Sequence, residues 1–131
     1  MKKINLYFIE VILLQLIDGV YETFEDDMSH FEKHIYRLKN QLVQTESVAE
    51  IQKIRSDLRI ILNNKDRIDF KELYYNSFDV FPETDQEPVI LLIKFWDIFF
   101  PNETWFDPSL IDESLIFYRD KLEYEEGETL I

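Results

Sequence analysis

The stretch PVILLIKFWDIFFPNETWFDP, residues 88–108, decides how the rest of the chain is interpreted. Pro88 suits the first turn of a helix and Pro101 ends one, because proline has no amide hydrogen for the helix interior. About a dozen residues lie between them, and such a helix is about 18 Å long, short of a roughly 30 Å hydrocarbon core. The stretch therefore predicts a helix at residues 88–100 that does not span a membrane.

Only Lys94 and Asp97 form a polar strip on this helix, and their i,i+3 spacing places them where they can pair. Nearly all the remaining circumference is apolar, which is typical of a helix surrounded by others. A buried strand at residues 89–96, VILLIKFW, is the alternative, because a short apolar run fits both structures. We expect the helix.

The composition limits the fold class. The chain has 131 residues, 46% of them hydrophobic, which is the size of one domain with an ample core. It contains 2 glycines and 4 prolines, too few for turn-rich sandwiches or barrels. We therefore predict an all-α protein, a compact bundle of five or six helices around the central helix at residues 88–100. Residues 1–131 form a single helical domain, with an acidic tail that frays from about residue 125.

Local patterns mark the other helices. The first is expected at about residues 4–24, where Asn5, Glu10 and Gln15 interrupt an apolar run that otherwise resembles a signal peptide. The second has an apolar stripe of coiled-coil spacing, formed by Met28, Phe31, Ile35, Leu38 and Leu42. The starts of the next two and of the last helix are marked by Ser47 with Glu50, Asp69 with Glu72, and Asp107 followed by Pro108. The apolar stripe of the last helix is formed by Ile111, Leu115, Tyr118 and Leu122.

The charge is strongly negative and unevenly distributed. Residues 1–65 hold 10 acids and 9 bases, a net charge of −1, whereas residues 66–131 hold 17 acids and 5 bases, a net charge of −12. Self-repulsion on this scale opposes folding, so such a surface usually has a compensating use. Solubility or salt tolerance is one explanation, and a cationic partner is the other.

The sequence lacks the motifs of several common catalytic and binding sites. The small number of glycines excludes both phosphate-binding loops, and no GxSxG elbow is present. The bases are too few for direct nucleic-acid binding. The absence of cysteine excludes disulfides and thiolate metal sites and fits a reducing, cytoplasmic compartment. We therefore expect no enzyme activity and no cofactor.

One local cluster has metal-ligand spacing. His30 and His34 stand at i,i+4 on the second helix, and Asp26 or Asp27 lies one turn earlier. Imidazoles one turn apart, together with a carboxylate, bind zinc or iron in many proteins. The glutamate in HFEKH is not where the HExxH motif places it. We interpret both histidines as surface or ion-paired residues, and a metal site is the alternative.

The remaining signal combines acids with aromatic residues on both sides of the central helix. Aromatic residues anchor protein interfaces, and charges accelerate the encounter of the partners. In the alternative interpretation, Trp105 and Phe106 belong to the core beneath a solvated acidic rim. The predicted partner-binding residues are Glu83, Asp85, Glu87, Glu103, Trp105, Phe106, Asp107, Asp112, Glu113, Phe117 and Asp120.

In size, net charge, helical content and its acidic-aromatic segment from Glu83 to Asp120, the chain resembles the small immunity proteins of bacterial toxin systems, including contact-dependent growth inhibition. The resemblance implies a cytoplasmic inhibitor that binds one cognate basic toxin domain, commonly a nuclease, and occludes its active site. Two alternatives stay open. One is a DNA-mimic inhibitor of the anti-restriction or anti-CRISPR kind, and the other is a metal-dependent enzyme that uses His30 and His34. The oligomeric state is left open.

Overall fold

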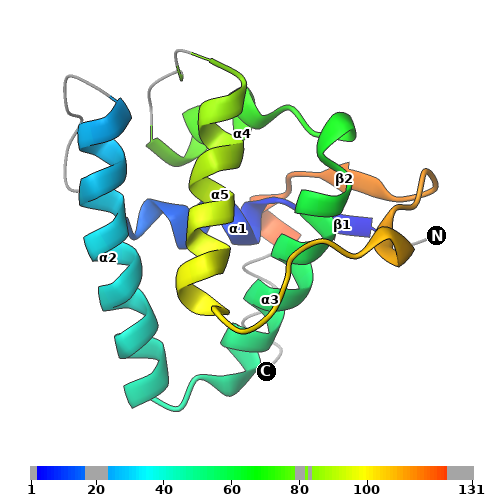
Figure 1. The fold of residues 1–131 in the computed structure, drawn as a ribbon. Coiled ribbons are helices and arrows are strands. Elements are labelled where there is room, and N and C mark those ends of the chain that lie inside the picture. Colours follow the sequence, from blue (N-terminus) through cyan, green and yellow to red (C-terminus); the bar gives the residue numbers. More distant parts are fainter. Residues whose placement is uncertain (1–2, 17–23, 79–81, 83, 124–131) are drawn as a thin grey trace.

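The computed structural model describes residues 3–16, 24–78, 82 and 84–123. These residues form a mostly helical, compact bundle with a small two-stranded parallel sheet (Figure 1). The elements are β1 (Lys3–Asn5), α1 (Tyr7–Leu14), α2 (Phe24–Gln44), α3 (Val48–Asn63), the 3-10 turn η1 (Lys65–Arg67), α4 (Phe70–Phe78), α5 (Gln86–Phe99), the 3-10 turn η2 (Pro108–Leu110) and β2 (Ile116–Tyr118). The predicted helical bundle is confirmed, whereas the sheet was not expected.

Helix α5 is the centre of the bundle, as predicted for residues 88–100. Figure 1 shows it between α2 and α3, and it contacts α2, α3 and α4. Pro88 is buried in its first turn, and the helix ends immediately before Phe100 and Pro101. The strand alternative for residues 89–96 is therefore wrong. Along most of α5, apolar side chains pack into the core. They include Phe95 and Phe99, whose rings are stacked on each other.

Helix α2 buries the stripe that its spacing predicted. Phe31, Ile35, Leu38 and Leu42 are all buried, and Met28 is partly buried against the same core. Burial of a single side chain of this size stabilises a fold by about 1.5–3 kcal/mol, so this face is a main source of stability.

The helix boundaries follow the capping patterns only in part. Asp69 caps α4, since its Oδ1 accepts a hydrogen bond from the Glu72 amide at 3.1 Å. Ser47 occupies the cap position of α3, but its side chain makes no capping hydrogen bond. Its Oγ lies 2.8 Å from Thr45 Oγ1 instead, so the predicted capping box with Glu50 is wrong.

The predicted pairing of Lys94 with Asp97 is replaced by an interhelical contact. Lys94 Nζ lies 3.6 Å from Glu32 Oε1 on α2, so the ion pair links two helices instead of two turns of one.

Among the described residues, no helix is both long and apolar enough to cross a membrane.

The expected first helix is wrong at its start. Lys3–Asn5 form a strand, and α1 begins only at Tyr7. The Asn5 side chain accepts a hydrogen bond from the Tyr7 amide at 3.1 Å, which separates the strand from the helix. The helix ends at Leu14, Gln15 and Leu16 form a turn, and residues 17–23 of the predicted range lie outside the described residues.

The expected last helix, from Asp107 onward, is also wrong. Before β2 only the turn η2 forms, and β2 pairs in parallel with β1, with Ile4 opposite Phe117. Among the described residues after β2, only 121–123 are helical. Ile111 is exposed although Leu115 is buried, so the expected stripe does not share one face. The frayed tail predicted from about residue 125 lies outside the described residues.

Candidate functional site

Residues 103–115, which we call the 103–115 loop, form most of the connection from α5 to β2 and contain only the short turn η2. Figure 1 shows this segment running beside α3 toward the two strands, and η2 contacts α3. A loop of this length with so little secondary structure is uncommon in a small domain and is often functional. Its backbone groups must be paired by something other than a helix or a sheet.

Asn63, the last residue of α3, binds the loop through its side chain. Its Nδ2 donates to the Trp105 carbonyl at 2.7 Å, and its Oδ1 accepts from the Asp107 amide at 2.9 Å. The same Nδ2 donates to the Arg59 carbonyl at 2.8 Å, in the final turn of α3. The side-chain amide thus pairs with the loop as a peptide group of a neighbouring strand would.

Asn64 repeats the arrangement one residue later. Its Nδ2 donates to the Leu110 carbonyl at 3.0 Å and to the Ile60 carbonyl at 2.9 Å. Its Oδ1 accepts from the Asp112 amide at 3.1 Å. Both asparagines are buried, where an unpaired backbone group is costly. The pair of them, which we call the asparagine clamp, holds the loop at two places.

Arg67 holds the far end of the loop. Its NH1 donates to the Asp112 carbonyl at 2.5 Å, its NH2 donates to the Leu115 carbonyl, and its guanidinium lies 5.5 Å from the centre of the Phe117 ring. Charge-assisted hydrogen bonds of this kind are stronger than neutral ones. The end of the loop is therefore fixed where it enters β2.

The beginning of the loop is held by α3 and α5 together. Trp96 Nε1 donates to the Glu103 carbonyl at 2.8 Å, and Arg59 NH2 donates to the Thr104 carbonyl at 3.2 Å. The Glu103 carboxylate lies 3.2 Å from Arg55 and 3.5 Å from Arg59. The Glu103 charge therefore faces bases of its own chain and is the least suited of the loop acids to a partner.

Two acids of the loop close tight local turns. Asp107 Oδ1 accepts from the Ser109 amide at 3.1 Å and from its hydroxyl at 2.6 Å. Asp112 Oδ1 accepts from the Ser114 amide at 2.9 Å and from its hydroxyl at 2.6 Å. The hydrogen bonds from Ser109 lower the pKa of Asp107, so that its negative charge is retained.

The loop exposes apolar residues among its acids. Phe106 is 56% exposed and Ile111 is 55% exposed, and Glu113 beside them is exposed as well. Trp105 is half-buried against the core, with Lys65 Nζ 4.7 Å from its ring centre. The alternative that both aromatic residues belong to the core therefore holds for Trp105 and not for Phe106.

The structure separates the other predicted partner-binding residues. Asp85 and Glu87 lie at the opposite end of α5 from Glu103, about 20 Å away along a helix of this length. Asp85 pairs with Lys71 at 3.2 Å. Glu83 lies outside the described residues. Phe117, half-buried, and Asp120, exposed, follow the loop in and after β2.

A second site of interest is a cleft of about 260 Å³ between α1, α4 and the segment after β2. Its buried acid is Glu10, which is 2% exposed. Glu10 accepts hydrogen bonds from Arg119 Nε at 2.5 Å and from Asn76 Nδ2 at 3.2 Å. Burial raises the pKa of Glu10, although Arg119 and Asn76 oppose the shift.

Because the pKa of Glu10 is raised in the folded state, the contribution of Glu10 to the free energy of unfolding falls as pH rises. The folded state holds the Glu10 proton more tightly than the unfolded chain does, so stability from this group is lost as pH rises through the raised pKa. We expect Glu10→Gln, which cannot ionise, to remove this loss. The melting temperature of wild type relative to the variant should therefore be higher at pH 4 than at pH 7, as measured by thermal unfolding. A difference that is independent of pH would contradict this.

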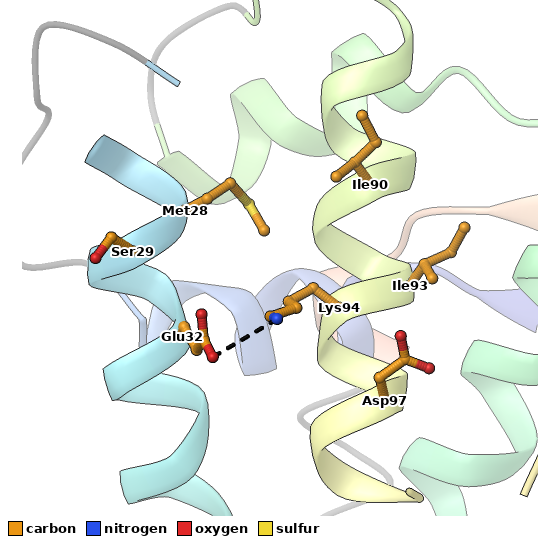
Figure 2. Close-up of a pocket in the computed structure, with 7 residues that line it drawn as sticks. All are labelled: Met28, Ser29, Glu32, Ile90, Ile93, Lys94 and Asp97. Atoms are coloured by element: carbon orange, nitrogen blue, oxygen red, sulfur yellow. Dashed lines mark ion pairs between the residues drawn. The ribbon is translucent and has the colours of Figure 1, made fainter. Parts of the chain in front are cut away.

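A third feature is an open groove of about 550 Å³ between α2 and α5 (Figure 2). The ion pair between Glu32 and Lys94 crosses it, and Ile90 and Ile93 supply apolar surface. No residue of the 103–115 loop lines this groove, so the groove is a separate surface from the loop.

The two histidines of α2 lie side by side. The Nε2 atoms of His30 and His34 are 3.0 Å apart, and His34 is buried. The side chains of Asp26 and Asp27, the carboxylates predicted to complete a metal site, lie outside the described residues. Within the described part of the chain, no three histidine, aspartate or glutamate side chains gather to hold a metal ion.

The sequence interpretation missed the residues that hold the loop. Asn63 and Asn64 belong to no motif in the sequence, and Arg59 and Arg67 contribute there only to the net charge. Two consecutive amide side chains, each with a donor and an acceptor, directly after an apolar face were the available signal. They indicate backbone that must be paired, without indicating which segment provides it.

Comparison with protein-family models, with curated proteins and with solved structures found no match for this chain.

Proposed function

We propose that this chain is an immunity-type inhibitor that binds a cationic toxin domain, such as a nuclease, through the 103–115 loop. It acts in the cytoplasm as a binding protein, without enzyme activity of its own. The observation that carries the proposal is the exposure of Phe106 and Ile111 between acidic residues, on a backbone held by buried side chains.

A held loop binds more tightly than a flexible one. A flexible loop loses conformational entropy when it becomes ordered at an interface, and this loss weakens binding. A preorganised loop is already ordered in the folded protein, so binding does not include that loss. The asparagine clamp and Arg67 hold the backbone on both sides of Phe106 and Ile111. The exposed apolar side chains are thereby presented in one arrangement, as interface anchors usually are.

The charge supports a basic partner. The loop belongs to the half of the chain with a net charge of −12, and Glu113 in the loop and Asp120 after β2 are both exposed. Complementary charge accelerates association and discriminates against acidic proteins. The proposed mechanism is occlusion of a cationic active site. The basic cleft attracts the acidic surface of this chain, and the apolar side chains of the 103–115 loop then fill the cleft.

The same features count against the DNA-mimic alternative. A surface that imitates phosphates needs carboxylates directed toward solvent, whereas Glu103 faces Arg55 and Arg59, and the Asp107 and Asp112 carboxylates accept hydrogen bonds from serines of their own loop. Phe106 and Ile111 are exposed and apolar, and such side chains do not match the polar, basic lining of a DNA-binding channel.

The charge part of the proposal is tested by Glu113→Lys. We expect the association rate with a basic toxin domain captured by affinity pull-down with this chain to fall about tenfold at low salt, with little change in dissociation. Stopped-flow or surface plasmon resonance kinetics measure both rates. Asp97→Lys, an exposed acid on α5 with the same charge change, is the matched control and should have a smaller effect. Equal effects of the two variants would place the interface elsewhere.

The apolar part is tested by Phe106→Ala. We expect the dissociation constant for the same toxin domain to rise by about 30-fold or more, which corresponds to loss of an anchor of about 2 kcal/mol. Tyr36→Ala removes an aromatic ring of similar exposure, 50%, from α2 and should leave binding unchanged. Binding that duplex DNA competes away and that Phe106→Ala leaves intact would favour the DNA mimic instead.

A further inference from the structure

The histidine pair of α2 has a geometry that its spacing alone does not require. His30 and His34 are one helical turn apart, yet their rings can take several rotamers that do not converge. In the structure the two Nε2 atoms lie 3.0 Å apart, with ring centroids 4.6 Å apart and an interplanar angle of 67°. The contact is a hydrogen bond between the two rings, whose donor depends on the tautomers, so the two Nε2 atoms face each other. A metal ion that displaces the proton between them would meet both nitrogens.

This separation matches two ligands of one metal ion. Imidazole nitrogen binds zinc at about 2.0–2.1 Å, which places two such nitrogens about 2.9 Å apart at a right angle and about 3.4 Å apart at the tetrahedral angle. The observed 3.0 Å lies between these two values. No change in the α2 backbone is needed for both nitrogens to reach one ion.

The surroundings favour a stable ligand pair. His34 is 8% exposed and His30 is half-buried, so neither ring is free to rotate as an exposed side chain is. On a helical wheel the pair lies across the buried stripe from Glu32 and Lys39, which contact α5 through Lys94 and the Ile98 carbonyl. The pair is therefore not part of the groove between α2 and α5.

We propose that His30 and His34 form a two-ligand binding site for a divalent transition-metal ion such as zinc, nickel or copper. Imidazole favours these ions, whereas magnesium and calcium favour oxygen. Water completes the coordination. Because both ligands come from one turn of α2, the bound ion stabilises that turn, and this proposal is independent of the 103–115 loop and of the proposed function.

The test is zinc binding by the full chain, measured by calorimetry and by histidine side-chain NMR. The chain has 2 histidines, so every imidazole signal that shifts comes from this pair. We expect one zinc ion per chain, shifts of both Nε2 resonances, and a melting temperature that rises with zinc concentration. Excess magnesium should not compete, although it occupies carboxylate sites on so acidic a surface.

His30→Ala should weaken zinc binding by at least about 100-fold, more than an outer-shell partner typically contributes. His34→Gln, which largely keeps the volume of the buried side chain, should do the same, and circular dichroism checks that each variant is folded. Failure of wild type to bind zinc overturns the proposal. So does equal zinc affinity in wild type and both folded variants, which would assign the ion to carboxylates.

Discussion

Trp96→Ala is expected to lower the free energy of unfolding by about 3–5 kcal/mol, the range for deleting a large buried aromatic side chain. Trp96 is 0% exposed in the last turn of α5, and its ring lies 4.5 Å from that of Phe100 and 4.9 Å from the Arg59 guanidinium. The loss has two parts, because the substitution leaves a cavity and also removes the hydrogen bond to the Glu103 carbonyl. Urea unfolding followed by circular dichroism measures the total.

Trp96→Phe separates the two parts. It keeps most of the apolar volume but has no donor for Glu103, so we expect it to lose clearly less stability than the alanine variant. Tyr36→Ala is the exposed aromatic control on α2 and should change stability by less than about 1 kcal/mol. A Trp96→Ala loss no larger than that of Tyr36→Ala would show that α5 is not the centre of the core.

Asn64→Ala is expected to lower the free energy of unfolding by about 2–4 kcal/mol, an unusually large effect for a polar residue. The substitution leaves the Leu110 carbonyl, the Ile60 carbonyl and the Asp112 amide without their partner. Each buried group left unpaired costs about 1–3 kcal/mol, and water that reaches the site recovers part of it. Hydrogen exchange at the Asp112 amide should accelerate together with the loss of stability.

Asn64→Asp sharpens the interpretation. It keeps the acceptor for the Asp112 amide and loses the donor to the two carbonyls, so we expect most of the alanine effect to remain. Asn40→Ala, at an exposed position of α2, is the matched control and should be nearly neutral. Normal stability and unchanged exchange in Asn64→Ala would mean that the asparagine clamp does not hold the loop.

The asparagine clamp also connects stability with the proposed function. If binding depends on a preorganised loop, a clamp variant that still folds should bind the toxin domain more weakly than wild type, although it alters no exposed residue. Phe106→Ala should show the converse, with weaker binding and nearly unchanged stability. The two kinds of variant therefore distinguish the anchor from its support.

Helices with strong local signals were predictable. The 3,4,3,4 spacing from Met28 to Leu42 allows only one buried face. Pro88 marks the first turn of a helix and Pro101 its end, so α2 and α5 followed from residues near one another in the chain. The Asp69 cap of α4 is equally local. These features need no knowledge of the rest of the molecule.

Residues 107–122 show where such reasoning ends. Ile111, Leu115 and Tyr118 have helical spacing, but Asn64 and Arg67 supply hydrogen bonds from outside the segment, and β1 pairs with Ile116–Tyr118. These contacts favour a turn, an extended backbone and a strand over the helix that propensity alone predicts. Nothing within the segment indicates that the partners exist.

The candidate site divides in the same way. The excess of acid, the aromatic residues beside it and the absence of known catalytic motifs were determined by the sequence itself, because charge and residue type do not depend on folding. Which of these residues face solvent was decided only by the tertiary structure, which places Trp105 against the core, directs Glu103 to Arg55 and Arg59, and leaves Phe106 exposed. The physical reason is distance along the chain: the side chains that hold the loop come from α3, η1 and α5, and only folding brings Asn63 and Asn64 to backbone groups more than 40 residues away.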